Sequence, residues 1–111
     1  MTTVNAHGVL SDGEFVMVVD SSAGRVLVGL FEFEGQWRFS LRVVVGRYLG
    51  FVSPASVTRQ GYETRDAALD SARELAVDVL KDKAAPRAHE WRKAAALLSE
   101  VEAPMPVGLF G

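Results

Sequence analysis

The chain of 111 residues contains no cysteine, and this absence excludes two classes of protein. Without thiols the chain can form neither the disulfide scaffold of small secreted domains nor a zinc site with thiolate ligands. Histidine is almost as rare, because only His7 and His89 occur, and neither has a second histidine or a carboxylate at ligand spacing. We therefore predict no metal site and no cofactor.

Long hydrophobic runs are also absent. The longest uninterrupted apolar segments, such as residues 15–19, are far shorter than the ~20 residues that a membrane-spanning helix needs. The first residues, MTTVNAHG, have neither the basic nor the apolar region of a secretory signal peptide. From these two observations we expect a cytoplasmic protein with no membrane partner.

Recognisable catalytic patterns are missing as well. No serine lies in a nucleophile elbow, and no glycine-rich loop leads from a strand directly into a helix to bind phosphate. Glu32 and Glu34 form a candidate carboxylate pair, but we expect them to face Arg38 and Arg42 across a solvated sheet. The sequence thus predicts no catalytic residue, and we do not expect an enzyme.

What the chain does contain is an ordinary globular composition, with 49% hydrophobic and 23% charged residues. A chain of this length is large enough for one domain with its own core. We therefore predict a single domain over 1–111. Its first segment, 1–12, either frays or adds an edge to a sheet, and its last segment, 104–111, is apolar and kept extended by prolines.

The centre of the sequence, residues 26–52, alternates side chains with the period of β-strands. From Trp37 to Val45, every second residue is apolar, and these residues define a core face. We expect a three-residue loop at 34–36 or a bulge there, because this pairs Phe33 with Trp37 and keeps the apolar rows of the two strands on one face. The predicted core face of the preceding strand is Leu27, Gly29, Phe31 and Phe33.

A second turn follows at Gly46-Arg47. Two residues suffice here, because glycine adopts the positive φ that the first position of a type II′ turn requires, and the turn pairs Val45 with Tyr48. The earlier apolar run at 15–19 supplies one more strand. The sequence therefore predicts a four-stranded antiparallel meander.

Two helices are expected after the sheet. Thr64 is a suitable N-cap, and the periodicity predicts a helix over 65–83 and a second over 89–101. The apolar stripe of the first is Ala68, Leu69, Ala72, Leu75, Ala76, Val79 and Leu80. That of the second is Trp91, Ala94, Ala95, Leu98 and Val101. The predicted fold class is α+β, with one long helix packed on the aromatic face of the sheet and a second helix at the C-terminal side.

Two stretches resemble a known family. The run FEFEGQWRFSLRVVVG at 31–46, followed by GYETRDAALDSARELA at 61–76, is similar to the YegP-like family of small bacterial β-β-β-α domains. The resemblance covers about half of the chain. The longer loop at 53–60, the additional N-terminal strand and the additional C-terminal helix depart from the family pattern. The resemblance implies a fold but no defined activity, so it assigns no site residue.

The outer face of the predicted sheet carries the main functional expectation. With the pairing given above, six apolar side chains gather on the face away from the long helix: Val26, Val28, Leu30, Val44, Leu49 and Phe51. A patch of this size is more than a monomer usually exposes, so something must cover it. The cover is either the chain's own second helix or tail, a second copy, or a different protein.

We therefore expect a small non-catalytic protein-binding module that occupies the surface of a partner. An inhibitor or regulator carried on a bacterial mobile element, acting alone or as a dimer, suits this size and composition. The tail contributes further apolar side chains. The predicted partner-binding residues are Val28, Leu30, Val44, Leu49, Phe51, Val107, Leu109 and Phe110.

The alternative is a nucleic-acid-binding regulator of antitoxin type. Residues 35–65 hold five arginines against one acidic residue, Glu63, although the whole chain has a net charge of −2. Arginines interleaved with aromatic residues suit a nucleic-acid surface. The candidate anion contacts are Arg38, Arg42 and Arg47. The absence of lysine from this segment favours a protein partner instead.

Overall fold

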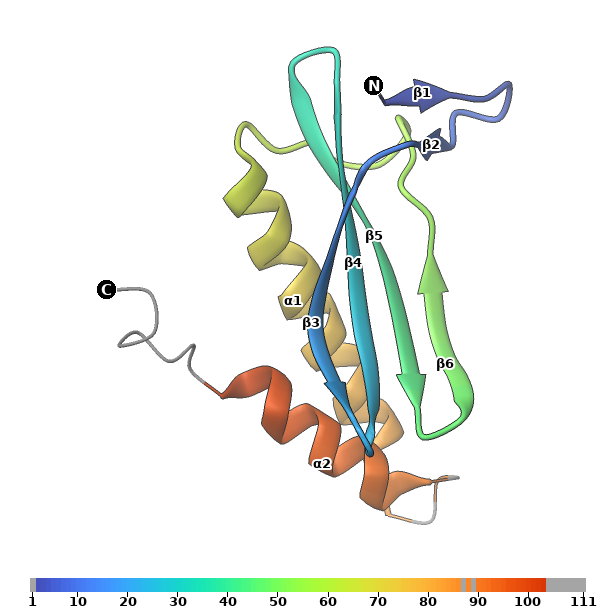
Figure 1. Cartoon of the computed structure of the whole chain (residues 1–111), viewed down its shortest axis with the longest axis vertical. Coiled ribbons are helices and arrows are strands. Elements are labelled where there is room, and N and C mark those ends of the chain that lie inside the picture. Colours follow the sequence, from blue (N-terminus) through green and yellow to red (C-terminus); the bar gives the residue numbers. More distant parts are fainter. Residues whose placement is uncertain (1, 87, 89, 104–111) are drawn as a thin grey trace.

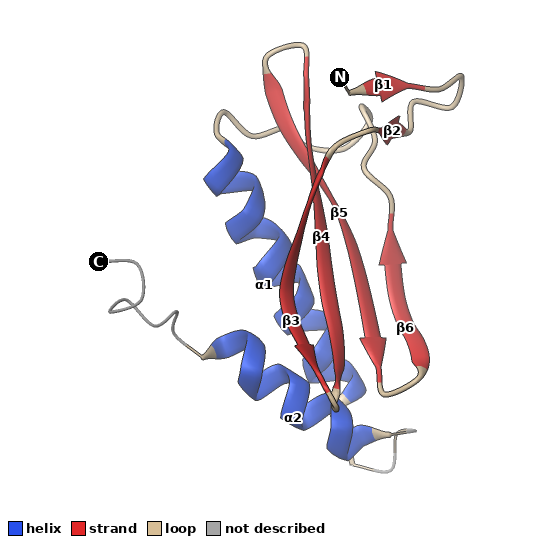
Figure 2. Cartoon of the chain, viewed as in Figure 1, coloured by secondary structure: helices blue, strands red, loops and turns tan. Residues whose placement is uncertain are grey.

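The computed structural model describes residues 2–86, 88 and 90–103 of the chain. It shows an α+β fold of two layers, in which two helices pack on one face of an antiparallel sheet (Figures 1 and 2). The strands are β1 (Thr3–Val4), β2 (Leu10–Ser11), β3 (Glu14–Ser21), β4 (Gly24–Phe33), β5 (Gln36–Val45) and β6 (Tyr48–Ser53). The helices are α1 (Arg65–Lys83) and α2 (Trp91–Glu102).

The main sheet has the order β3-β4-β5-β6, which confirms the predicted four-stranded meander. Its central turn differs from the prediction. The turn has two residues, Glu34 and Gly35, with φ of 54° and 78°, so Phe33 pairs with Gln36 and not with Trp37. Two successive positive φ angles are typical of a type I′ turn, whose twist matches that of the flanking strands. The predicted three-residue loop is therefore wrong.

The shorter turn reverses the two faces of β4. Val28 lies opposite Leu41, and the row of β4 that faces the helices is buried. Glu32 lies opposite Trp37 and not opposite Arg38, so the predicted ion pairs across the sheet are absent from the described residues. A change of one residue in loop length moves every side chain of a strand to the other face. The central core row is Val26, Val28, Leu30, Leu41, Val43 and Val45.

The second turn agrees with the prediction at its start. Val45 pairs with Tyr48, and Gly46 has φ of 61°. A bulge then shifts the register, so Val43 pairs with Phe51 and not with Gly50. Because paired residues share a face, Phe51 lies on the helix side, where it packs against the main core.

The first helix begins and ends where the sequence predicts. The hydroxyl of Thr64 accepts a hydrogen bond of 3.1 Å from the backbone N–H of Ala67 and caps α1. Small side chains on its buried face let the helix lie close to β4 and β5. The second helix begins at Trp91, and its buried residues are Ala94, Leu97 and Val101. The predicted burial of Trp91, Ala95 and Leu98 is only partial, and Leu97, which the predicted stripe did not include, is buried.

A smaller core lies on the opposite face of the sheet. Leu10, Phe31 and Ala55 are buried together there, beside the end of the sheet that carries the Glu34-Gly35 turn. The backbone N–H of Leu10 donates to the carbonyl of Ala55 at 2.9 Å, which fixes β2 to the loop after β6. The predicted aromatic face is therefore divided: Phe31 lies on the side away from the long helix, while Trp37 and Phe39 pack against the main core on the helix side. The N-terminal hairpin and the loop at 54–60 cover the end of the face that carries Phe31.

Candidate interaction surface

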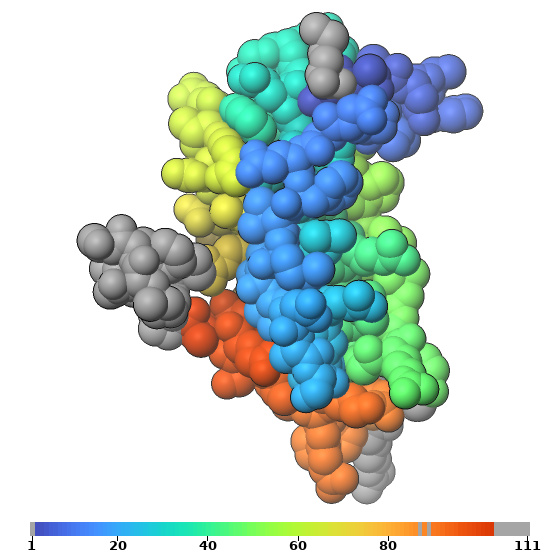
Figure 3. All heavy atoms as spheres, viewed as in Figure 1, coloured from blue at the N-terminus to red at the C-terminus, as the bar shows by residue number. Residues whose placement is uncertain are grey.

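The other end of the outer sheet face has no element packed on it in the described part of the chain. Figure 3 views the molecule from this side, with the strands in front and the helices visible only beside and below them. The cross-strand register defines the surface. Met17 lies opposite Leu27, Leu27 opposite Arg42, and Arg42 opposite Val52. We call the following set the open face: Phe15, Met17, Arg25, Leu27, Arg42, Val44, Leu49 and Val52.

Large apolar side chains on the open face are exposed to solvent. The exposed fractions are 60% for Phe15, 47% for Met17, 53% for Leu49 and 58% for Val52. Single exposed apolar residues are common on protein surfaces, but a contiguous group of them is typical of an interaction site. Two of the four lie on the edge strand β3 and two on the opposite edge strand β6, and the half-buried Leu27 and Val44 lie between them on the same face, so the apolar residues extend across the sheet.

A hollow of about 250 Å³ lies within the open face. Its lining consists of Met17, Arg25, Leu27, Arg42 and Val44. Pockets for cofactors and other small molecules usually measure ~300–1,000 Å³ and enclose most of the ligand. A smaller hollow on a sheet surface suits one or two side chains of another protein.

The two arginines of the open face have no partner within the described residues. Arg25 and Arg42 form no hydrogen bond or ion pair there, although Asp20 lies opposite Arg25 in the ladder. Arg38, on the same strand as Arg42, differs. Its side chain is half-buried, and it donates to the carbonyl oxygen of Arg59 at 3.2 Å and to the Gln36 side chain at 3.3 Å. The charges of Arg25 and Arg42 therefore remain available to a ligand.

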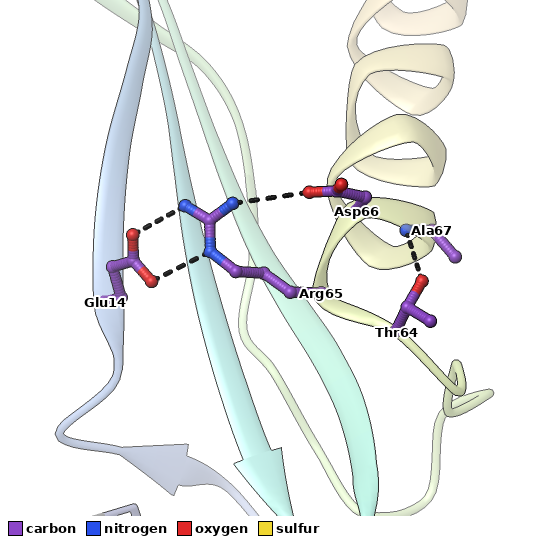
Figure 4. A network of polar contacts seen from close by, with 5 residues as sticks. All are labelled: Glu14, Thr64, Arg65, Asp66 and Ala67. Carbon is purple, nitrogen blue, oxygen red and sulfur yellow. Dashed lines mark hydrogen bonds and ion pairs between the residues drawn. The ribbon is translucent and has the colours of Figure 1, made fainter.

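An ion pair fixes the start of β3, immediately before Phe15. Arg65 donates to both carboxylate oxygens of Glu14, through Nε at 3.0 Å and through a terminal nitrogen at 2.6 Å (Figure 4). The pair joins the first residue of α1 to the edge strand. The Arg65 hydrogen bonds hold the pKa of the Glu14 carboxyl below its ordinary value of 4.5.

The predicted partner-binding residues divide into three groups. Val44 and Leu49 lie on the open face as predicted. Val28 and Leu30 are buried in the main core, and Phe51 packs against it, so their predicted place on the outer face is wrong. The two-residue turn places Val28 and Leu30 on the helix side of the sheet, and the β6 bulge does the same for Phe51. The predicted tail contacts, Val107, Leu109 and Phe110, lie outside the described residues.

The predicted anion contacts do not form one cluster. Arg42 lies on the open face. Arg38 donates a hydrogen bond to the carbonyl oxygen of Arg59, in the loop that covers the other end of the outer sheet face, and Arg47 is exposed in the β5–β6 turn. Sequence reasoning missed five members of the open face: Phe15, Met17, Arg25, Leu27 and Val52. A two-residue turn at Glu34-Gly35 would have predicted Arg25 and Leu27, because turn length decides which row of β4 faces outward, but the pair lacks the Asn or Asp that usually marks such a turn.

Another hollow, of about 620 Å³, includes four acidic residues and Trp37 in its lining. The acidic residues are Asp12, Glu14, Glu32 and Glu34. Glu14 already forms an ion pair with Arg65.

In the described part of the chain, no three His, Asp or Glu side chains are arranged to hold a metal ion, and no helix is long and apolar enough to cross a membrane.

A scan against models of known protein families and searches among curated proteins and solved structures found no match to this chain. The resemblance to the YegP-like family therefore stays a prediction.

Proposed function

We propose that the chain is a non-catalytic binding module that acts by occupying the surface of another protein in the cytoplasm, as an inhibitor or regulator does. The observation that carries this proposal is the open face. One end of the outer sheet face is covered by β2 and the loop at 54–60, while the other end presents apolar side chains around a hollow. A surface of this composition is costly in water unless a partner covers it.

The energetics agree with a specific but not very tight complex. Complete burial of a side chain such as Phe, Leu, Met or Val contributes roughly 1.5–3 kcal/mol, and residues that are half-exposed gain about half of that. Summed over the open face, the gain is several kcal/mol. Association itself costs about 4–15 kcal/mol. The apolar contacts alone therefore give little net affinity, and the hollow and its arginines must supply specificity.

The proposal is tested by affinity capture from the source cells with the full chain and two charge variants. We expect Val52→Glu, on the edge strand β6 beside Arg42, to abolish retention of a partner that the parent chain retains. Asp78→Lys is the matched control, because Asp78 is exposed on α1, on the helix side of the molecule. A partner retained equally by the parent and by Val52→Glu would contradict docking through the open face.

A nucleic-acid-binding regulator of antitoxin type is the second candidate. It is supported by Arg25, Arg42 and Arg47, which are exposed and have no partner in the described part of the chain. The aliphatic surface around the first two weighs against it, because bases stack on aromatic side chains. If this candidate is right, an oligonucleotide at low salt binds at micromolar concentration, and the affinity falls steeply as salt is added.

A further inference from the structure

The arrangement of charge around the hollow indicates what kind of partner fits it. Arg25 lies opposite Val44, and Leu27 lies opposite Arg42, so the four side chains form a two-by-two block across β4 and β5. The arginines occupy one diagonal of the block and the aliphatic residues occupy the other. Diagonal neighbours in an antiparallel pair are about 7–8 Å apart at the backbone, within the reach of two arginine side chains toward a common point.

Two like charges in this position repel each other, and no described residue forms an ion pair with either of them, although Asp20 lies opposite Arg25 on the far side from Arg42. A carboxylate placed between them would accept charge-assisted hydrogen bonds from both guanidinium groups. Met17, Leu27 and Val44 line the same hollow, so an apolar side chain beside that carboxylate would contact them. The carboxylate and the apolar side chain would therefore have to be neighbours in one segment of the ligand.

On the basis of the proposed function, we propose that the partner presents an acidic–hydrophobic segment, with a Leu, Ile or Phe side chain in the hollow and an adjacent Asp or Glu between Arg25 and Arg42.

Other occupants satisfy these groups less well. A second copy docked face to face would bring four arginines together. The chain's own residues 104–111, PMPVGLFG, include no Asp or Glu to meet the arginines. A nucleic acid offers phosphate charge but no aliphatic group for a hollow whose lining contains no aromatic residue.

The test is a titration of the isotopically labelled full chain with blocked octapeptides, followed by amide chemical shifts in NMR spectra. The probe alternates glutamate and leucine. Two matched peptides replace either every glutamate by glutamine or every leucine by alanine. We expect the glutamate–leucine peptide to shift the amides of Met17, Leu27 and Val44. Each matched peptide should bind at least about tenfold more weakly, because each lacks one of the two contacts.

Arginine variants locate the carboxylate. Arg25→Gln and Arg42→Gln should each weaken binding of the glutamate–leucine peptide by about tenfold without changing the melting temperature, since both side chains are exposed and without a partner in the described structure. Arg59→Gln is the matched control, because it removes the same charge from an exposed loop position. It should leave the affinity unchanged.

Several results would overturn the inference. If the glutamine–leucine peptide binds as well as the glutamate–leucine peptide, the surface is a purely apolar site, and the proposed function survives without an acidic partner. If no peptide shifts the open face, the inference fails, and the capture experiment alone decides the proposed function. Binding of a single-stranded oligonucleotide in place of the peptides would favour the second candidate function. If deletion of residues 104–111 shifts the amides of the open face, the tail is the occupant. If light scattering shows a dimer that Val52→Glu dissociates, a second copy is the occupant.

Discussion

At the scale of single residues, Leu41 shows how the register decides what a side chain does. It lies opposite Val28 at the centre of the sheet and is completely enclosed between the sheet and α1. Leu49, on the neighbouring strand, has the same side chain but lies on the open face. We therefore expect replacement by alanine to affect the stability of the fold strongly at Leu41 and weakly at Leu49.

We expect Leu41→Ala to reduce the free energy of unfolding by ~2–5 kcal/mol, because it leaves a cavity in a close-packed core. Leu49→Ala should change it by less than about 1 kcal/mol, since the side chain has little to lose in packing. Urea unfolding followed by circular dichroism measures both. Equal effects of the two variants would show that the assignment of sheet faces is wrong.

Glu34 is one of two described glutamates, with Glu90, whose backbone lies in a region that disfavours their side chain. Its φ of 54° lies in the left-handed region, where side chains other than Asn, Asp and Gly are disfavoured. Asn-Gly is the preferred pair for a type I′ turn, so Glu34→Asn should stabilise the protein by about 0.5–1 kcal/mol. Glu34→Ala is the control, because alanine removes the charge and keeps the strain. A melting temperature raised by alanine but not by asparagine would contradict the backbone explanation.

At the scale of elements, the ion pair between Glu14 and Arg65 joins β3 to the start of α1. The pKa of the Glu14 carboxyl is lowered in the folded chain, chiefly by its hydrogen bonds from Arg65. A lowered pKa means that the ionised form is favoured by folding. The contribution to stability is therefore present above the ordinary carboxylate pKa of 4.5 and is lost as the pH falls through the folded value.

The lowered pKa of Glu14 determines how the stability of the fold changes with pH. The difference in unfolding free energy between the parent chain and Glu14→Gln should be largest near neutral pH and should disappear in acid, below the folded pKa. In an Arg65→Gln background, which also removes the contact of 3.5 Å with Asp66, Glu14→Gln should cause no further pH-dependent loss, because the pair is already broken. A difference that stays constant from neutral pH into acid would show that the glutamate acts through packing and not through its charge.

The sequence predicted helices better than strand faces, and the reason is physical. The limits of α1 follow from local signals, namely the Thr64 cap and the alanine stripe, and these need no knowledge of distant residues. The faces of β4 depend on whether its turn has two or three residues, and the Glu34-Gly35 pair lacks the usual Asn or Asp that marks a two-residue turn. The β6 bulge, which moves Phe51 to the core side, has no clear sequence signal.

At the scale of the whole molecule, the outer sheet face is divided between two roles. One end forms the small core of Leu10, Phe31 and Ala55, and the other end is the open face. The sequence predicted an apolar outer face and placed Val44 and Leu49 on it. It could not predict the extent of that face, because the cover comes from β2 and the loop at 54–60, whose contact with the sheet is a long-range one.

We propose that the open face is kept apolar for a partner and not for the stability of this chain. The most direct measurement is urea unfolding of the full chain carrying Met17→Thr, Leu49→Thr and Val52→Thr together, since threonine retains the preference for a strand while removing apolar surface. The account predicts a combined loss of less than about 2 kcal/mol in unfolding free energy, because each of the three side chains is already about half in water. Phe31→Thr, at the covered end of the same face, should cost ~3–5 kcal/mol in the same experiment. A loss from the triple variant as large as that from Phe31→Thr would show that the chain covers the open face itself, and would contradict the claim.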